Sequence, residues 1–189
     1  MIGPRRVARA LRCSLGRPLR AFRRAEAGTA SVEFVVVFPI IMLSFFMAIE
    51  TATYALRMSM LERALNITTR ELRLGQMTDP TSAKIAQSIC SRASGFIADC
   101  NNVVMVELQD VSTSGWTPLA PAATCVNRDA KVQPVTTVNQ GSGNDMMIIR
   151  ACAIIQPMFP WVGVGLALPK DSKGGYDIVA TSAFVNEPD

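Results

Sequence analysis

The sequence predicts an α+β protein in which a long amino-terminal helix crosses a membrane and continues into a small domain with a short helix and an antiparallel sheet. The first observation is an uncharged apolar run from Phe34 to Ile49, which an amphipathic pattern extends to Leu74. The second is a set of three later runs with strand-type composition. We therefore expect a basic leader at 1–28, a transmembrane helix at 29–56 and a periplasmic α+β domain at 57–189.

Positive charge is concentrated in the leader. Residues 1–28 contain eight of the 19 Lys and Arg residues but only one of the 15 Asp and Glu residues, so 11 basic and 14 acidic side chains remain in the rest of the chain. Under the positive-inside rule the leader stays in the cytoplasm and the body is exported. Because the body is mildly acidic, we expect no nucleic acid as a partner.

The apolar run is long enough to span a bilayer. A hydrocarbon core of about 30 Å requires roughly 20 apolar helical residues, and only Glu33 and Glu50 interrupt the stretch from Thr29 to Leu56. We expect a single-pass anchor in the inner (cell) membrane. Pro39 should kink this helix, because it removes one backbone hydrogen bond and crowds the preceding turn.

The helix should continue beyond the membrane and end near Leu74, since Gly75 is a natural stop. A second, short helix is expected from Ala83 to Ala93, with Asp79, Thr81 or Ser82 as its cap.

Strand signals occupy the remainder of the chain. The three predicted strands are Val103–Val111, Met146–Ile155 and Tyr176–Val185. The stretch 112–144 is rich in Ser, Thr, Pro, Gly and Asn and should be loop, with at most a weak strand at Val132–Val138. Prolines in and after the stretch 158–167 argue against a regular central strand there.

Four cysteines lie beyond the span, where an oxidising compartment would allow two disulfides. They are Cys90, Cys100, Cys125 and Cys152. Of three possible pairings, chain spacing favours Cys90 with Cys100 and Cys125 with Cys152, although spacing alone does not decide, and four buried free thiols are the alternative. The chain has no His and no C-x-x-C spacing, so we expect no metal and no cofactor.

The same composition argues against an enzyme. The commonest general base is missing, and the exported part has no Gly-rich phosphate loop, nucleophile elbow or suggestively spaced pair of carboxylates. We expect no catalytic residue and no small-molecule substrate.

The start of the apolar run carries the most informative spacing. Gly28 ends the basic leader, and Glu33 follows five residues later inside an otherwise apolar helix. A charged side chain within a span costs at least roughly 2.5–3.5 kcal/mol, so it should have a partner or a use. Cleavage after Gly28 would supply a partner, because the new α-amine of Thr29 would be a cation within reach of Glu33 on the same or a neighbouring subunit.

These residues resemble the class III signal of type IV prepilins, and more narrowly the TadE-like pseudopilins of tight-adherence (Flp-type) pilus systems. The resemblance covers the basic leader, the spacing from Gly28 to Glu33, the apolar helix with Pro39, Glu50 and the helical extension. It implies cleavage between Gly28 and Thr29 by a membrane prepilin peptidase, an assembly role for Glu33, and other pilins and assembly-platform proteins as partners. Major Flp pilins usually carry Glu-Tyr where this chain has Glu33-Phe34, and they are shorter, which favours a minor subunit.

Two other fates of the amino end stay open. The leader could be retained in an uncleaved signal anchor, with Glu33 reaching the cytosolic interface, and the chain would then be a membrane-anchored periplasmic scaffold or binding protein. An ordinary signal peptidase could instead cut near Ala48, Ala52 or Ala55, although Glu50 and the helical continuation argue against it.

Overall fold

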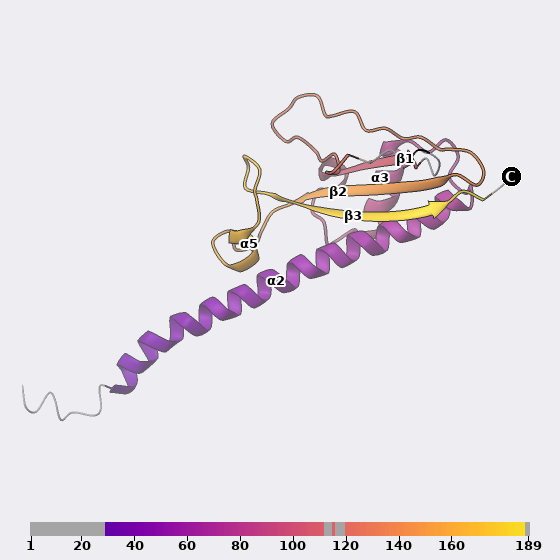
Figure 1. Cartoon of the computed structure of the whole chain (residues 1–189). Coiled ribbons are helices and arrows are strands. Elements are labelled where there is room, and N and C mark those ends of the chain that lie inside the picture. Colours follow the sequence, from indigo (N-terminus) through magenta and orange to yellow (C-terminus); the bar gives the residue numbers. More distant parts are fainter. Residues whose placement is uncertain (1–28, 112–114, 116–119, 188–189) are drawn as a thin grey trace, which may run out of the picture. The chain divides into compact units, whose positions relative to one another are not determined.

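The computed structural model describes residues 29–111, 115 and 120–187, so the leader lies outside the described part. The chain divides into two compact units, Met1–Phe45 and Phe46–Asp189. The order of elements is a long helix, two short helices, two strands, another short helix and a last strand (Figure 1). This is the α+β class that the sequence predicts.

Helix α2 (Thr29–Arg73) is the long amino-terminal helix. In the first unit Glu33 is the one charged residue of this helix, and Pro39 lies inside it. It is the one helix among the described residues that is long and apolar enough to cross a membrane, by length and composition.

The end of α2 agrees with the predicted stop to within one residue. Gly75 adopts a φ of 63°, and its N–H donates to the carbonyl of Leu72 over 3.0 Å. The next N–H, of Gln76, reaches back to Glu71 over the same distance. These bonds satisfy carbonyls that the last turn would leave unpaired, and glycine adopts the left-handed conformation at little cost.

Two short helices follow. Helix α3 (Ser82–Arg92) is capped by Thr81, whose hydroxyl accepts a 3.3 Å hydrogen bond from the N–H of Lys84. Helix α4 (Cys100–Val103) is a single turn that the sequence did not reveal, and it leads directly into the first strand.

Three antiparallel strands form one sheet in the order β1-β2-β3. They are β1 (Val104–Asp110), β2 (Met146–Ile155) and β3 (Tyr176–Val185). The register places Val106 opposite Ala151 and Ala151 opposite Ala180. All three strands agree with the sequence prediction.

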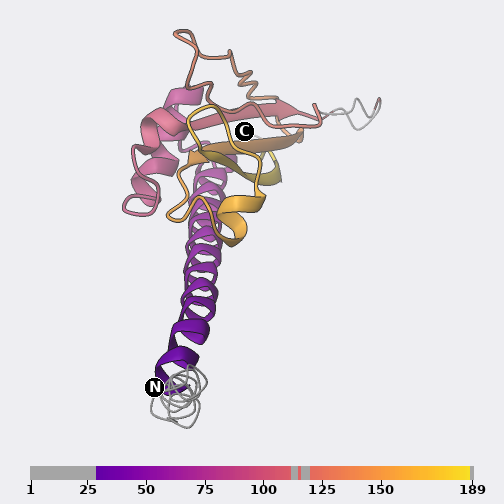
Figure 2. The same ribbon diagram turned by 90° about the vertical axis from the view of Figure 1, so that its left-hand side faces the viewer.

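The main core lies between one face of the sheet and the two longer helices, as Figures 1 and 2 show for the second unit. Strand residues two apart share a face, so alternate side chains of each strand enter this core. From the helices come Leu61 and Leu65 of α2 with Ile85 and Ile89 of α3, all at most 1% exposed.

The stretch 112–144 is largely loop where it is described, as expected. The weak strand foreseen at Val132–Val138 reduces to one parallel bridge between Val138 and Leu108. Leu108 donates to the carbonyl of Thr137 and accepts from Asn139, so the loop occupies the outer edge of β1. A further short helix, α5 (Gly163–Ala167), lies in the proline-flanked stretch that sequence analysis left without an element.

Candidate membrane and assembly site

The amino-terminal part of α2 presents an apolar surface that Glu33 alone interrupts with a charge. Its side chains from Val32 to Ile41 are exposed on every side of the helix, with Val35 68% exposed. Such a surface suits lipid or the apolar helices of other membrane subunits, because a helix that is apolar all round is stable only where water is absent.

Glu33 is the one charged residue in this surface. Its side chain is exposed, and no ion pair with another described residue is recorded for it. It lies one turn after Thr29, the first residue of α2. Gly28, on the other side of the predicted cut, lies outside the described residues.

Glu50 is the second carboxylate of the apolar run, and it is completely buried. Its Oε2 accepts two backbone hydrogen bonds, one from Met158 at 3.0 Å and one from Phe159 at 2.9 Å. Hydrogen bonds to a charged acceptor are the stronger ones, and two of them offset part of the cost of burying a carboxylate. Glu50 therefore ties α2 to a segment more than 100 residues further along the chain.

Polar and aromatic neighbours surround this tie. The Arg57 guanidinium donates to the carbonyl of Gln156 over 2.9 Å, and the rings of Tyr54 and Tyr176 lie 5.8 Å apart. Burial raises the pKa of the Tyr176 hydroxyl, while nearby Arg57 opposes the increase and Glu50 adds to it. Tyr176 is therefore a neutral member of the core at physiological pH.

The segment held by Glu50 packs closely on α2. The Phe46 and Phe159 rings are 4.8 Å apart. A Cβ at Gly163 would lie 3.3 Å from Cγ of Met47, and one at Gly165 would lie 2.5 Å from the carbonyl oxygen of Phe159. The two glycines thus permit a backbone approach that no larger residue would allow at position 165.

Four cysteines of the second unit form two disulfides, Cys90–Cys100 and Cys125–Cys152. These are the pairs that their spacing favours. The first joins α3 to α4, and the second ties the loop before β2 to the sheet. Asp177 lies beside Cys125 and Cys152, but the two sulfurs are bonded to each other and so do not provide thiolate ligands.

A buried ion pair lies on the same face of the sheet as the second disulfide. Glu107 of β1 pairs with Arg150, its cross-strand neighbour on β2. The Thr124 hydroxyl donates to Glu107 over 3.2 Å, and Arg150 donates to the carbonyl of Ala120 over 2.7 Å. These contacts attach the loop to the face of the sheet opposite the main core.

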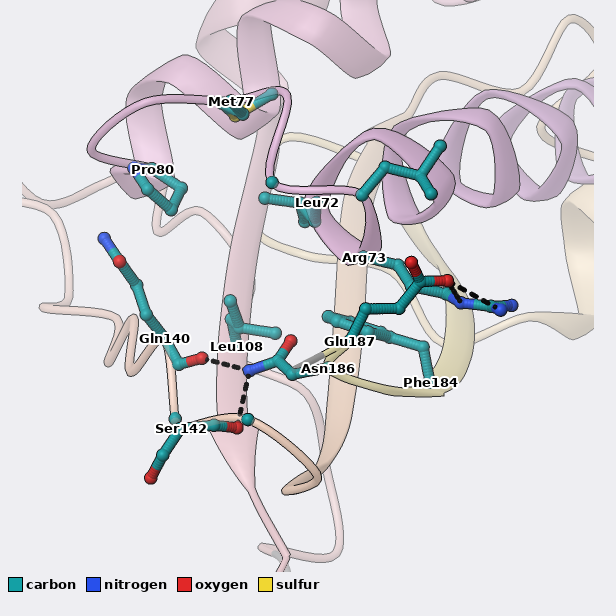
Figure 3. Close-up of a pocket in the computed structure, with 14 residues that line it drawn as sticks. Leu72, Arg73, Met77, Pro80, Leu108, Gln140, Ser142, Phe184, Asn186 and Glu187 are labelled. Carbon is teal, nitrogen blue, oxygen red and sulfur yellow. Dashed lines mark hydrogen bonds and ion pairs between the residues drawn. The ribbon is translucent and has the colours of Figure 1, made fainter. Parts of the chain in front are cut away.

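The end of the last strand borders a cleft of about 340 Å³. Arg73, the last residue of α2, forms an ion pair with Glu187 at 3.0 Å, which Figure 3 marks with dashed lines. Asn186 donates through Nδ2 to the carbonyl oxygens of Gln140, at 2.6 Å, and Ser142, at 3.3 Å. Leu108 and Phe184 supply the apolar wall. These contacts hold Asn186 and Glu187 to α2 and to the loop before β2.

Sequence analysis assigned no structural role to Glu50 and placed nothing at α5. Two features of the sequence point to this contact. Glu50 is a carboxylate in an apolar run and needs hydrogen-bond donors, and the proline-interrupted segment has backbone N–H groups without strand partners. Pro39 lies within α2 as expected, and its effect on the path of the helix stays a prediction.

Comparison with known families identifies one match. Residues 28–70 match the model of the TadE-like protein family. No curated protein and no solved structure matches the chain.

The match covers the apolar part of α2, Glu33, Glu50 and most of the helical extension. Over these residues it confirms the resemblance read from Gly28, Glu33 and the apolar run, and TadE-like proteins are structural, pilin-like proteins associated with the Tad pilus. A single apolar amino-terminal helix agrees with single-pass membrane anchoring. The amino-terminal helix of this chain, over residues 28–70, is therefore similar to that of TadE-like proteins.

Proposed function

We propose that this chain is a minor pseudopilin that takes part in the assembly of a Flp/Tad-type pilus, and so in surface adhesion. The observation that carries the proposal is the coincidence of the family match over residues 28–70 with a helix that begins at Thr29 and has an uncharged apolar run from Phe34 to Ile49. In this proposal 1–28 is a cytoplasmic leader, 29–56 spans the inner membrane, and 57–189 is a periplasmic domain.

Processing is the first step of the proposal. A prepilin peptidase would cut between Gly28 and Thr29, where the small Gly28 lets the protease approach the backbone. The new α-amine of Thr29 would then lie one helical turn from the Glu33 carboxylate, a spacing at which opposite charges attract. Glu33 would use this charge to seat the subunit against a neighbouring pilin or the assembly platform.

The amino-terminal mass tests processing. Membranes from cells with and without the peptidase are compared by mass spectrometry, and the expected result is a chain that begins at Thr29 only when the peptidase is present. Gly28→Val should retain the leader in both strains, because the larger side chain blocks that approach. A chain that begins at Met1 in both strains would exclude cleavage and favour an uncleaved, membrane-anchored periplasmic scaffold.

The role of Glu33 has its own test. Glu33→Ala should insert in the membrane as well as the natural chain but reduce pilus output, while Glu62→Ala on the exposed face of the helical extension should change neither. Equal pilus output from Glu33→Ala and the natural chain would remove the assembly role from Glu33.

A further inference from the structure

The segment from Pro157 to Pro169 contains no charged residue, yet several of its large apolar side chains are exposed. Trp161 is 70% exposed, Leu166 64% and Met158 53%. Val162 is buried and Gly163 lies close to Met47, so the segment is packed against α2. The exposed side chains of Trp161, Leu166 and Met158 therefore belong to a segment whose backbone is fixed. Three large apolar side chains exposed within one short, uncharged segment form an apolar patch on that segment, whose exposure to water is unfavourable.

The position of this patch along α2 indicates what covers it. The segment contacts the helix at Phe46, Met47 and Glu50, at the end of the uncharged apolar run. A helix from Glu33 to Glu50 rises about 25 Å at roughly 1.5 Å per residue, against a hydrocarbon core of about 30 Å. Phe46, Met47 and Glu50 lie in the carboxyl-terminal part of the proposed span 29–56, so the segment tied to them lies at the outer boundary of the bilayer that this span crosses.

Two basic residues, Lys170 and Arg57, flank the patch, as expected for a segment at the membrane boundary. Lys170 follows the uncharged segment and donates through Nζ to the carbonyl of Pro160 over 2.8 Å. Arg57 lies at the other end, bonded to Gln156. Cations beside an apolar patch suit a surface in which phosphate groups border acyl chains, and tryptophan is enriched at that boundary.

We propose that residues 157–167 form a second membrane contact, in which Trp161, Leu166 and Met158 enter the outer boundary of the bilayer that α2 crosses. Glu50 positions this contact, because its carboxylate holds the N–H groups of Met158 and Phe159. The inference rests on the membrane span of the proposed function and on neither processing nor pilus assembly.

Tryptophan fluorescence of the full chain in vesicles tests this contact. Trp116→Phe leaves Trp161 as the sole tryptophan, and the protein is reconstituted in phosphatidylcholine–phosphatidylglycerol vesicles that carry bromine on the lipid chains, either close to the headgroups or near the chain ends. The matched control replaces both tryptophans by Phe and introduces Val135→Trp, at a loop position that is 93% exposed. Flotation first establishes that each variant is in the vesicles.

The expected result is loss of most Trp161 emission with shallow bromine, a smaller loss with deep bromine, and no loss for the Val135→Trp control. Trp161 emission that matches the control in floated vesicles would overturn the membrane contact while leaving the span intact. Blue-shifted emission without bromine quenching would also overturn it and assign the patch to a protein neighbour. Failure of all variants to float would overturn both the span and the contact.

Discussion

Glu50 and Phe159 are 109 positions apart in the chain, yet the carboxylate of the first accepts a 2.9 Å hydrogen bond from the backbone N–H of the second. The same oxygen accepts from Met158, so one buried side chain of α2 organises the whole segment that leads to α5. This relationship makes Glu50 a structural element of the second unit as well as an interruption of the apolar run.

Replacing Glu50 should loosen the segment. Glu50→Ala leaves two N–H groups without their acceptor and should lower the free energy of unfolding by about 3 kcal/mol. Glu50→Gln retains an acceptor oxygen and should cost less. Denaturant unfolding of the detergent-solubilised chain measures both changes, and limited proteolysis should show new cleavage near Met158 in the Ala variant. Glu62→Ala, on the exposed face of α2, is the control, and a loss equal to that of Glu50→Ala would contradict a specific role for Glu50.

The two disulfides should contribute unequally to stability. Cys125–Cys152 closes a separation of 27 residues and Cys90–Cys100 one of 10. In the chain-entropy model, the longer loop stabilises by about 1 kcal/mol more. We expect the paired Ala variant at Cys125 and Cys152 to unfold at lower denaturant than the one at Cys90 and Cys100. Peptide mapping without reductant checks the pairing itself, and a peptide that joins Cys90 to Cys152 would contradict it.

The Glu107–Arg150 pair should show strong coupling. Glu107→Met alone leaves the Arg150 charge buried without its partner and should destabilise the chain by about 3–5 kcal/mol. The double variant with Met at both positions removes both charges and should be more stable than either single variant. A double-mutant cycle from denaturant unfolding measures the coupling, and simple additivity of the two changes would exclude it.

Acid should weaken the ion pair between Arg128 and Asp171, which joins two loops. The hydrogen bond from Arg128 is the largest cause that lowers the pKa of Asp171 below its ordinary value, and the N–H groups of Gly175 and Lys173 add to it. A depressed folded-state pKa gives stability that is present above the unfolded-state pKa of about 4 and is lost as pH falls through the folded-state pKa. Asp171→Asn should therefore flatten the loss of stability in acid.

The matching test of that loop contact is Arg128→Gln. This variant should reduce, in part, the loss of unfolding free energy as the pH falls. Adding Asp171→Asn to it should then change the slope of unfolding free energy against pH less than Asp171→Asn does in the natural chain. Unfolding midpoints measured from neutral to acid pH give these slopes, and an unchanged slope in Asp171→Asn would remove Asp171 from the acid response.

The regular elements could be predicted because their signals are local. The runs of β2 and β3 are apolar, bounded by turn residues and long enough to pair, and both agree with their predicted bounds. Gly75 predicts the end of α2 because glycine, which has no side chain, adopts the left-handed conformation at little cost wherever it occurs. Thr81 is one of the three predicted cap residues, with Asp79 and Ser82, and its own hydroxyl caps α3.

Elements that depend on distant partners could not be predicted. Helix α5 contains two glycines and lies between prolines, so its own residues disfavour a helix, and packing against Phe159 and Met47 stabilises it. A carboxylate at position 50 in an apolar run indicates that hydrogen-bond donors must lie nearby. The sequence does not indicate which residues supply them. Val132 and Val135 have strand-type side chains, yet both stay exposed, because the adjacent edge of β1 pairs with the loop only around Val138.

Helix α2 has one mechanical consequence. Its Leu61–Leu65 layer is buried against the sheet, and the same helix continues to the apolar amino end. A force that draws this end along the helix axis loads the layer in shear, so that many contacts must fail together instead of peeling apart in turn. The Glu50 tie lies nearer the pulled end than this layer and takes up load before it does. Within the second unit, α2 is thus held to the rest of the domain at two separate levels, the Glu50 hydrogen bonds and the Leu61–Leu65 layer.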